Sequence, residues 1–161
     1  MIKNFNLLFI TFFNVGKIKF ASGTFASFFT CILFLILINF IEIEIIFLLT
    51  AITFCYSLIA INKTYDQFTS DDPHEIVIDE VVGQMLTLLA IPIYETLHPT
   101  NNIFYCISCF FLFRLFDIWK PFPVSYIDRN LKGPLGIMLD DVLAGIYAIS
   151  SFVIILFFLG G

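Results

Sequence analysis

The sequence predicts an all-α, multi-helix integral membrane protein that forms a single domain over residues 1–161. Apolar residues make up 60% of the chain and charged residues only 13%, against about 25% charged in an average soluble domain. Apolar runs recur along the chain, each close to the ~17–25 residues that a helix needs to cross a bilayer. The net charge of −5 argues against nucleic-acid binding, which needs a basic surface.

About five spans, four to five in all, follow from these runs. Four of the runs are predicted to span the membrane: Gly23–Ile41, Ile45–Ile61, Val81–Leu97 and Val142–Leu159. The remaining one, Ile103–Trp119, carries Arg114 and Asp117 towards its end, so we expect it to end early or to lie partly in the interface. The earlier run Phe5–Phe13 is too short to cross a bilayer and predicts an interfacial or packed helix.

The basic residues orient this arrangement. With five spans, residues 1–22, 62–80 and 120–141 lie on one side of the membrane, and Arg114 lies nearest that side. The same side holds all the lysines and the second arginine: Lys3, Lys17, Lys19, Lys63, Lys120, Arg129 and Lys132. The positive-inside rule makes it the cytoplasmic side. Without the span at 103–119 the basic residues would divide between the two sides, which favours the five-span topology.

Two segments with clustered acidic residues border the spans on this side. A helix that begins at Pro73, a favoured first-turn residue, would place Glu75, Asp79 and Gly83 on one face. The second segment continues into a stripe of small residues at helical spacing: Asp141, Ala144, Gly145 and Ala148. Such stripes let another helix approach closely, so we expect Gly83 and Gly145 to meet at one tight crossing.

The predicted crossing would gather four carboxylates: Asp79, Glu80, Asp140 and Asp141. These groups repel one another unless a cation lies between them, and a set of oxygen ligands suits Mg²⁺. The competing interpretation is that they are solvated helix ends. An acid at the centre of a membrane helix costs about 2.5–3.5 kcal/mol, which favours the metal site.

Four basic residues point to a phosphate site. Arg114, Lys120, Arg129 and Lys132 surround Asp117 and Asp128 in a segment rich in proline and glycine. Arginine binds phosphate through two hydrogen bonds and lysine binds it as a point charge, although the positive-inside bias alone could account for any one of them.

The first span opens at Ser22, Gly23 and Thr24, where hydroxyl and amide groups could cap the helix or hold an anion. We expect capping, with Thr24 as a candidate phosphate contact. The four cysteines lie in apolar runs and are expected to act as small hydrophobic residues rather than as zinc ligands. His74 is either an acid–base group or a solvated loop residue.

Two stretches of sequence have a distinctive pattern. The first reads Asp72-Pro-x-x-Ile-Val-Ile-Asp79-Glu80-Val-x-Gly83. The second reads Arg114-x-Phe-Asp117-Ile-x-Lys120-Pro-x-Pro123, then Asp128-Arg129, then Lys132-Gly133, and ends at Asp140-Asp141-x-x-Ala144-Gly145. Together they resemble the phosphatidylglycerophosphatase A family, over roughly Gly16 to Ala148. The segment Ala21–Ser27 departs from that family's usual Ala-Pro-Gly-Thr-x-Gly-Ser, because serine replaces the proline and alanine replaces the second glycine.

The resemblance implies Mg²⁺-dependent hydrolysis of the terminal phosphate of phosphatidylglycerophosphate, a membrane lipid, in a multi-pass protein of the bacterial cytoplasmic (inner) membrane whose active site faces the cytoplasm. It implies four metal ligands: Asp79, Glu80, Asp140 and Asp141. Glu75 or Asp117 would be a further ligand or the base that orients water. The phosphate and glycerol groups would contact Arg114, Lys120, Arg129 and Lys132. No protein partner is predicted.

Two other classes of protein compete with this interpretation. A phosphotransferase of the CDP-alcohol type would also use acids at the membrane edge, but its Asp-Gly-x-x-Ala-Arg pattern is missing from the sequence. A non-enzymatic transporter would place acidic residues near the middle of broken helices, whereas here they gather at one membrane face.

Overall fold

The computed structural model describes residues 2–68, 73–91 and 102–159, and this part of the chain is helical with no strand. Its α-helices are α1 (Ile2–Ile10), α2 (Ser22–Leu37), α3 (Ile43–Thr64), α4 (Ile78–Leu88), α6 (Asn102–Trp119), α7 (Val124–Asn130) and α8 (Pro134–Leu159). Two short 3₁₀ turns, Val15–Lys17 and Tyr65–Gln67, follow α1 and α3. The predicted all-α class is therefore confirmed.

Within the described part of the chain, three helical segments are long and apolar enough to cross a membrane: Ile43–Gln67, Asn102–Trp119 and Pro134–Phe158. Helix α2 is apolar but has only 16 residues. Helix α4 ends at Leu88, and residues 92–97 of the expected third span lie outside the described residues. The count of about five spans is thus not confirmed.

Several expected boundaries move. Helix α6 continues to Trp119 and does not end early at Arg114. Helix α8 begins at Pro134, so Asp140 and Asp141 lie in its second turn rather than in a loop before it. The expected short helix at the N-terminus is present as α1, whose Ile10 is fully buried and whose Asn6 accepts a hydrogen bond from the Tyr56 hydroxyl of α3.

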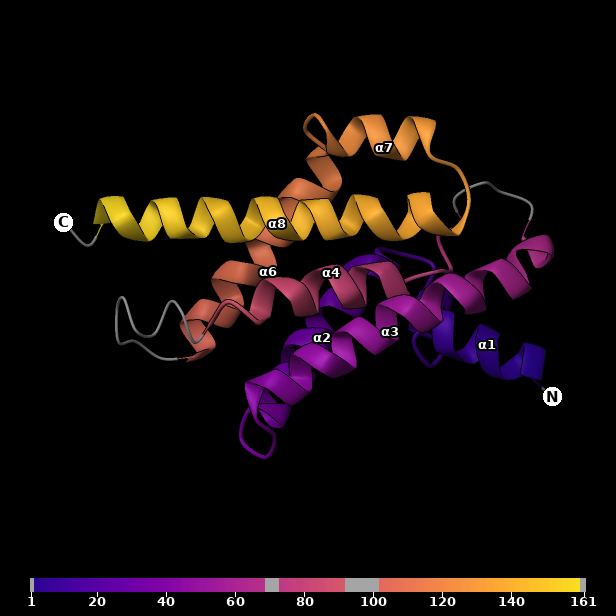
Figure 1. Cartoon of the computed structure of the whole chain (residues 1–161), viewed down its shortest axis with the longest axis horizontal. Coiled ribbons are helices and arrows are strands. Elements are labelled where there is room, and N and C mark those ends of the chain that lie inside the picture. The colour runs from indigo at the N-terminus through magenta and orange to yellow at the C-terminus, as the bar shows by residue number, and fades with distance from the viewer. Residues whose placement is uncertain (1, 69–72, 92–101, 160–161) are drawn as a thin grey trace.

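Helix α4 lies at the centre of the helical assembly. It packs against α2, α3, α6 and α8, and its contact with α8 is the most extensive between any two elements. Figure 1 shows α8 running along most of the length of the molecule, with α4 beside it, α6 crossing it and α7 on its outer side. The first turn of α4 is therefore surrounded by other helices, which positions its acidic residues inside the protein.

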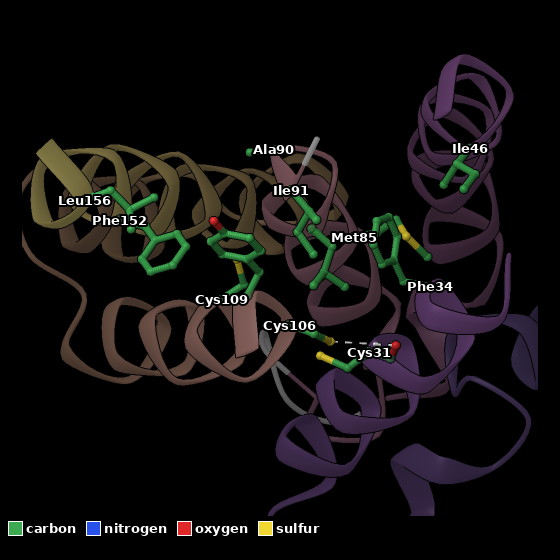
Figure 2. Packing of buried hydrophobic residues seen from close by; sticks show 12 residues of the cluster. Cys31, Phe34, Ile46, Met85, Ala90, Ile91, Cys106, Cys109, Phe152 and Leu156 are labelled. Atoms are coloured by element: carbon green, nitrogen blue, oxygen red, sulfur yellow. Dashed lines mark hydrogen bonds between the residues drawn. The ribbon is translucent and has the colours of Figure 1, made fainter. Parts of the chain in front are cut away.

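Apolar side chains fill the space between α2, α4, α6 and α8 (Figure 2). Phe34, Ile91 and Tyr105 are fully buried there. The same cluster includes three of the four cysteines, Cys31, Cys106 and Cys109, all of them free thiols, which confirms their expected hydrophobic role; Cys55 is exposed. Large apolar residues cover the outer faces of the long helices, as expected for surfaces in contact with lipid.

The predicted tight crossing of α4 and α8 is confirmed. A Cβ atom added at Gly145 would lie 2.9 Å from the carbonyl oxygen of Gly83, and one added at Gly83 would lie 2.7 Å from that of Asp141. Ala144 and Ala148 of the same stripe are fully buried. The small residues let the two backbones approach, and this approach brings the acidic ends of the helices together.

The expected helix start at Pro73 is wrong, because α4 begins five residues later at Ile78. Tertiary contacts hold the preceding segment outside the helix. The Val77 amide donates to the carbonyl oxygen of Ile10 at 3.0 Å. Gly16 packs so closely on the Glu75 carbonyl that a Cβ there would lie 1.9 Å from its oxygen. Glu75 consequently does not share a helix face with Asp79.

Candidate active site

Three carboxylates converge at the crossing of α4 and α8. Asp79 and Glu80 come from the first turn of α4, and Asp141 comes from α8. One oxygen atom of each lies within 4.8 Å of the others, and Asp141 is only 3% exposed. The α4–α8 contact at Gly83 and Gly145 thus brings side chains that are distant in sequence close enough to bind one metal ion.

The chemistry of this cluster fits a divalent cation. Glu80 Oε2 and Asp141 Oδ2 are buried and accept no hydrogen bond from the described residues. Burying ionised carboxylates without a partner is costly, and a bound cation removes that cost. Because all the candidate ligand atoms are carboxylate oxygens, Mg²⁺ suits them better than a metal that prefers nitrogen or sulfur.

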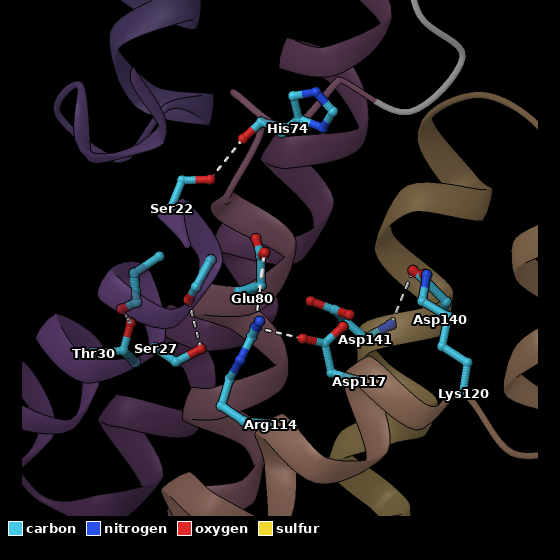
Figure 3. A network of polar contacts seen from close by, with 12 residues as sticks. Ser22, Ser27, Thr30, His74, Glu80, Arg114, Asp117, Lys120, Asp140 and Asp141 are labelled. Carbon is cyan, nitrogen blue, oxygen red and sulfur yellow. Dashed lines mark hydrogen bonds and ion pairs between the residues drawn. The ribbon is translucent and has the colours of Figure 1, made fainter. Parts of the chain in front are cut away.

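Arg114 of α6 supplies positive charge beside the cluster (Figure 3). Its Nη1 atom lies 3.9 Å from Glu80 Oε1 and also pairs with Asp117, three residues later on the same helix. Helix α2 closes the other side, since a Cβ at Gly23 would lie 1.8 Å from Glu80 Oε1. Four helices therefore contribute to a site that combines carboxylates with one guanidinium group.

Asp140 has a different environment from its neighbour Asp141. Lys120 Nζ lies 2.6 Å from Asp140 Oδ2 and 2.5 Å from Asp128 Oδ1. The other Asp140 oxygen accepts the Asp141 amide at 3.0 Å. Burial lowers the pKa of Lys120, but the hydrogen bonds and charges of Asp128 and Asp140 outweigh it and hold that pKa above its usual value. Lys120 is therefore a charged ammonium at neutral pH.

The other predicted site residues are not members of the three-carboxylate cluster. Glu75 is exposed in the segment before α4, and Thr24 is half-buried in the first turn of α2. Arg129 at the end of α7 and Lys132 in the following loop are exposed. Of the predicted phosphate-binding bases, Arg114 is joined by an ion pair to Glu80 of the carboxylate cluster.

The expected capping of α2 by Ser22 is wrong. The residue that precedes the helix is Ala21, in a left-handed conformation with φ of 52°, and no side chain caps this end. The Ser22 hydroxyl instead donates to the His74 carbonyl oxygen at 2.9 Å. This bond holds the start of α2 against the segment that leads into α4.

A polar cavity of about 550 Å³ lies next to the cluster, and the sequence did not predict it. Its lining includes Lys17, Lys19, Ser22, Gly23, His74 and Glu75. Gly23 borders both this cavity and Glu80. Lys17 and Lys19 lie close in sequence to Ser22, Gly23 and Thr24, and this proximity was a signal for an anion site. The cavity itself forms only because tertiary contacts bring residues 16–23 and 74–75 together.

Comparisons with known proteins show what this chain is similar to. A protein from Haemophilus influenzae named phosphatidylglycerophosphatase A is 39% identical over 137 residues, which are 85% of this chain and 80% of the relative. The Escherichia coli protein of the same name is 32% identical over 148 residues, 92% of this chain and 79% of the relative. A Bacteroides thetaiotaomicron protein named putative phosphatidylinositol-3-phosphatase is 34% identical over 148 residues, which are 90% of this chain and 87% of the relative.

No solved structure is significantly similar to this chain. The family model for phosphatidylglycerophosphatase A matches residues 8–156, a range that contains the three carboxylates, Arg114 and Lys120. On this match and the two relatives of that name, the chain belongs to the phosphatidylglycerophosphatase A family.

Proposed function

We propose that this protein hydrolyses the terminal phosphate of phosphatidylglycerophosphate in an Mg²⁺-dependent reaction that yields phosphatidylglycerol and inorganic phosphate. Membership of the family supports the activity and the substrate. One observation supports the metal dependence. In the three-carboxylate cluster, Glu80 Oε2 and Asp141 Oδ2 are buried and have no hydrogen-bond partner among the described residues.

The residues of the cluster have distinct roles in this proposal. Asp79, Glu80 and Asp141 would hold the Mg²⁺ ion, which when bound neutralises charge on the phosphoryl group and helps to orient water. Arg114 would stabilise the negative charge of the transferring phosphoryl group. Asp117, which pairs with Arg114, fixes the guanidinium and is better placed than the exposed Glu75 to act on water.

In the reaction, the oxygen of a water molecule attacks phosphorus and the bond from phosphorus to the glycerol oxygen breaks. The proton lost by water goes to a carboxylate, and the glycerol oxygen takes up a proton as it leaves. The cavity lined by Lys17 and Lys19 offers a basic route for the phosphate group to the cluster, with Thr24 in the adjoining first turn of α2. The exposed Arg129 and Lys132 would attract the anionic headgroup at the membrane surface.

The topology that fits this function has five spans and a cytoplasmic active site. The apolar helices indicate a membrane protein, and the relatives of the same family are bacterial. In our proposal α4 belongs to the third span, and the positive-inside rule orients the acidic helix ends towards the cytoplasm. The protein would then act in the bacterial inner membrane, on the side where the basic residues lie.

One relative points to a second substrate class. The Bacteroides thetaiotaomicron relative is named for phosphatidylinositol 3-phosphate, which is also a lipid phosphomonoester. The same carboxylates and arginine would serve either lipid, because both reactions break a phosphomonoester bond next to a bilayer. The family match places phosphatidylglycerophosphate first and does not support a phosphotransferase or a transporter.

The test is phosphate release by the purified protein in mixed micelles, measured with three substrates. We expect release from phosphatidylglycerophosphate that requires Mg²⁺ and stops with EDTA. Release from phosphatidylinositol 3-phosphate and from p-nitrophenyl phosphate should be at least about tenfold slower, which corresponds to 1.4 kcal/mol of discrimination. Equal rates on all three substrates would contradict the assigned substrate. Full activity in EDTA would contradict the proposed Mg²⁺ dependence.

A further inference from the structure

The acidic side chains at the crossing of α4 and α8 form two groups that differ in how their charge is neutralised. In the first group, Asp141 and Glu80 each bury an oxygen that has no hydrogen-bond partner among the described residues. In the second group, Asp140 and Asp128 share one ammonium group, that of Lys120. The two groups are joined by adjacent residues of α8, since Asp140 accepts the Asp141 amide.

Both oxygens of Asp140 already have a donor. Oδ2 receives the Lys120 ammonium at 2.6 Å, and Oδ1 receives the Asp141 amide at 3.0 Å (Figure 3). Asp140 is also absent from the set of carboxylates whose oxygens lie within 4.8 Å of one another. An ammonium group in contact with Asp140 would repel a divalent cation at the same oxygen.

The position of Lys120 is set by three elements. It follows α6 directly, with φ of 46°, a left-handed conformation that is unfavourable for a residue other than glycine. Its ammonium bridges Asp128 of α7 and Asp140 of α8. Two ion pairs that join separate helices help to hold the strained conformation.

Enzymes that act on phosphate esters often use two metal ions about 3.5–4 Å apart. Adjacent aspartates such as Asp140 and Asp141 would be natural ligands for such a pair. We propose that the Lys120 ammonium takes the place of a second metal ion, so that the protein binds one divalent cation, held by Asp79, Glu80 and Asp141. This inference rests on the proposed function, because it assumes that the three-carboxylate cluster binds a metal.

Lys120 and Asp128 are then positioning residues rather than phosphate ligands. Lys120 neutralises Asp140, and Asp128 helps to hold the Lys120 ammonium in place. Asp140 in turn orients the Asp141 backbone by accepting the hydrogen bond from its amide. A lysine cannot leave with the product, so this part of the charge balance is permanent. Charge balance at the three-carboxylate cluster then depends on the binding of one divalent cation.

The experiment counts Mn²⁺ ions bound to the purified full chain in detergent, using the electron paramagnetic resonance signal of free Mn²⁺. We expect one tightly bound Mn²⁺ per chain. Asp141→Asn should weaken binding by at least about tenfold, the lower end of what loss of a metal-site partner costs. The matched change Asp140→Asn, at the preceding position on α8, should leave one Mn²⁺ bound and weaken its binding less than Asp141→Asn does. The asparagine keeps an oxygen that can accept the Asp141 amide.

Lys120→Met gives a second, independent measurement. It removes the ammonium and leaves Asp128 and Asp140 without a cation, so a second Mn²⁺ should bind, whereas Lys120→Arg should still bind one. Two ions in the wild type, or equal weakening by Asp140→Asn and Asp141→Asn, would overturn the inference and leave the proposed function standing. A folded Lys120→Met variant that still binds one ion would do the same, and if that variant does not fold the aspartate pair decides. A wild type that binds no Mn²⁺ would instead overturn the metal site itself.

Discussion

The contact between Gly83 and Gly145 predicts how activity responds to added bulk. A Cβ at Gly145 would lie 2.9 Å from the Gly83 carbonyl oxygen and 3.3 Å from Thr87 Oγ1. Comfortable non-bonded contacts lie at about 3.5–4.0 Å, so even alanine must push α8 away from α4 by roughly half an ångström. Leucine places several more atoms in the same space and must displace the helix further.

This displacement acts directly on the cluster, because Asp141 lies one turn before Gly145 on α8 and Glu80 lies about one turn before Gly83 on α4. A misplacement of 1 Å can cost about 10²-fold in rate. We therefore expect about tenfold lower activity for Gly145→Ala and at least about 10²-fold for Gly145→Leu, with weaker apparent Mg²⁺ affinity in both. Overpacking should also lower the free energy of unfolding by about 1–3 kcal/mol.

The assay is phosphate release as a function of Mg²⁺ concentration. Ser150→Leu is the matched control, since it adds the same side chain to an exposed position of α8 where the serine hydroxyl bonds only to its own helix, at the Ile146 carbonyl. That variant should behave as the wild type does. Superimposable curves for Gly145→Leu and the wild type would refute the idea that this contact assembles the site.

Three further predictions concern the charges, the topology and the approach of α2. Asp79→Asn should abolish turnover while the protein remains inserted and keeps its thermal transition, because the amide preserves the shape but not the charge; normal activity would exclude this carboxylate as a ligand. Cysteines introduced at Asn62 and Lys132 should react with a membrane-impermeant thiol reagent in inverted vesicles but not in intact cells, and labelling of either from outside would contradict the five-span topology. Gly23→Ala should reduce activity by at least about tenfold, since its Cβ would lie 1.8 Å from Glu80 Oε1, and an unchanged rate would show that α2 is not held against the cluster.

The crossing at the centre of the site could be predicted from the sequence because it depends on local periodicity. Residues three or four apart share a helix face, so the spacing of Asp141, Ala144, Gly145 and Ala148 already defined a surface that another helix can approach. The neighbouring acids then had to meet wherever Gly83 met that surface. The all-α class followed in the same way from the length and apolar character of the runs.

The remaining features depend on contacts between distant segments, which periodicity does not contain. The start of α4 was misplaced because Val77 bonds to Ile10, and the capping of α2 was wrong because Ser22 bonds to His74. The environment of Lys120 likewise arises from two separate helices. The sequence alone does not distinguish a lysine that binds phosphate from one whose ammonium bridges two aspartates.

The departure from the family pattern at Ala21–Ser27 can now be interpreted in physical terms. Ala21 enters α2 in a left-handed conformation, whereas a proline at position 22 would favour an extended residue before it. Serine is compatible with the left-handed turn, and its hydroxyl fastens the helix start to the segment before α4. A proline ring restricts the chain at this point, and here the Ser22–His74 hydrogen bond restricts it through a tertiary contact. Gly23 can still approach Glu80 closely. Because Gly23 and Thr24 match the family pattern, the substitutions alter the path of the chain into α2 without filling the space that the carboxylate needs.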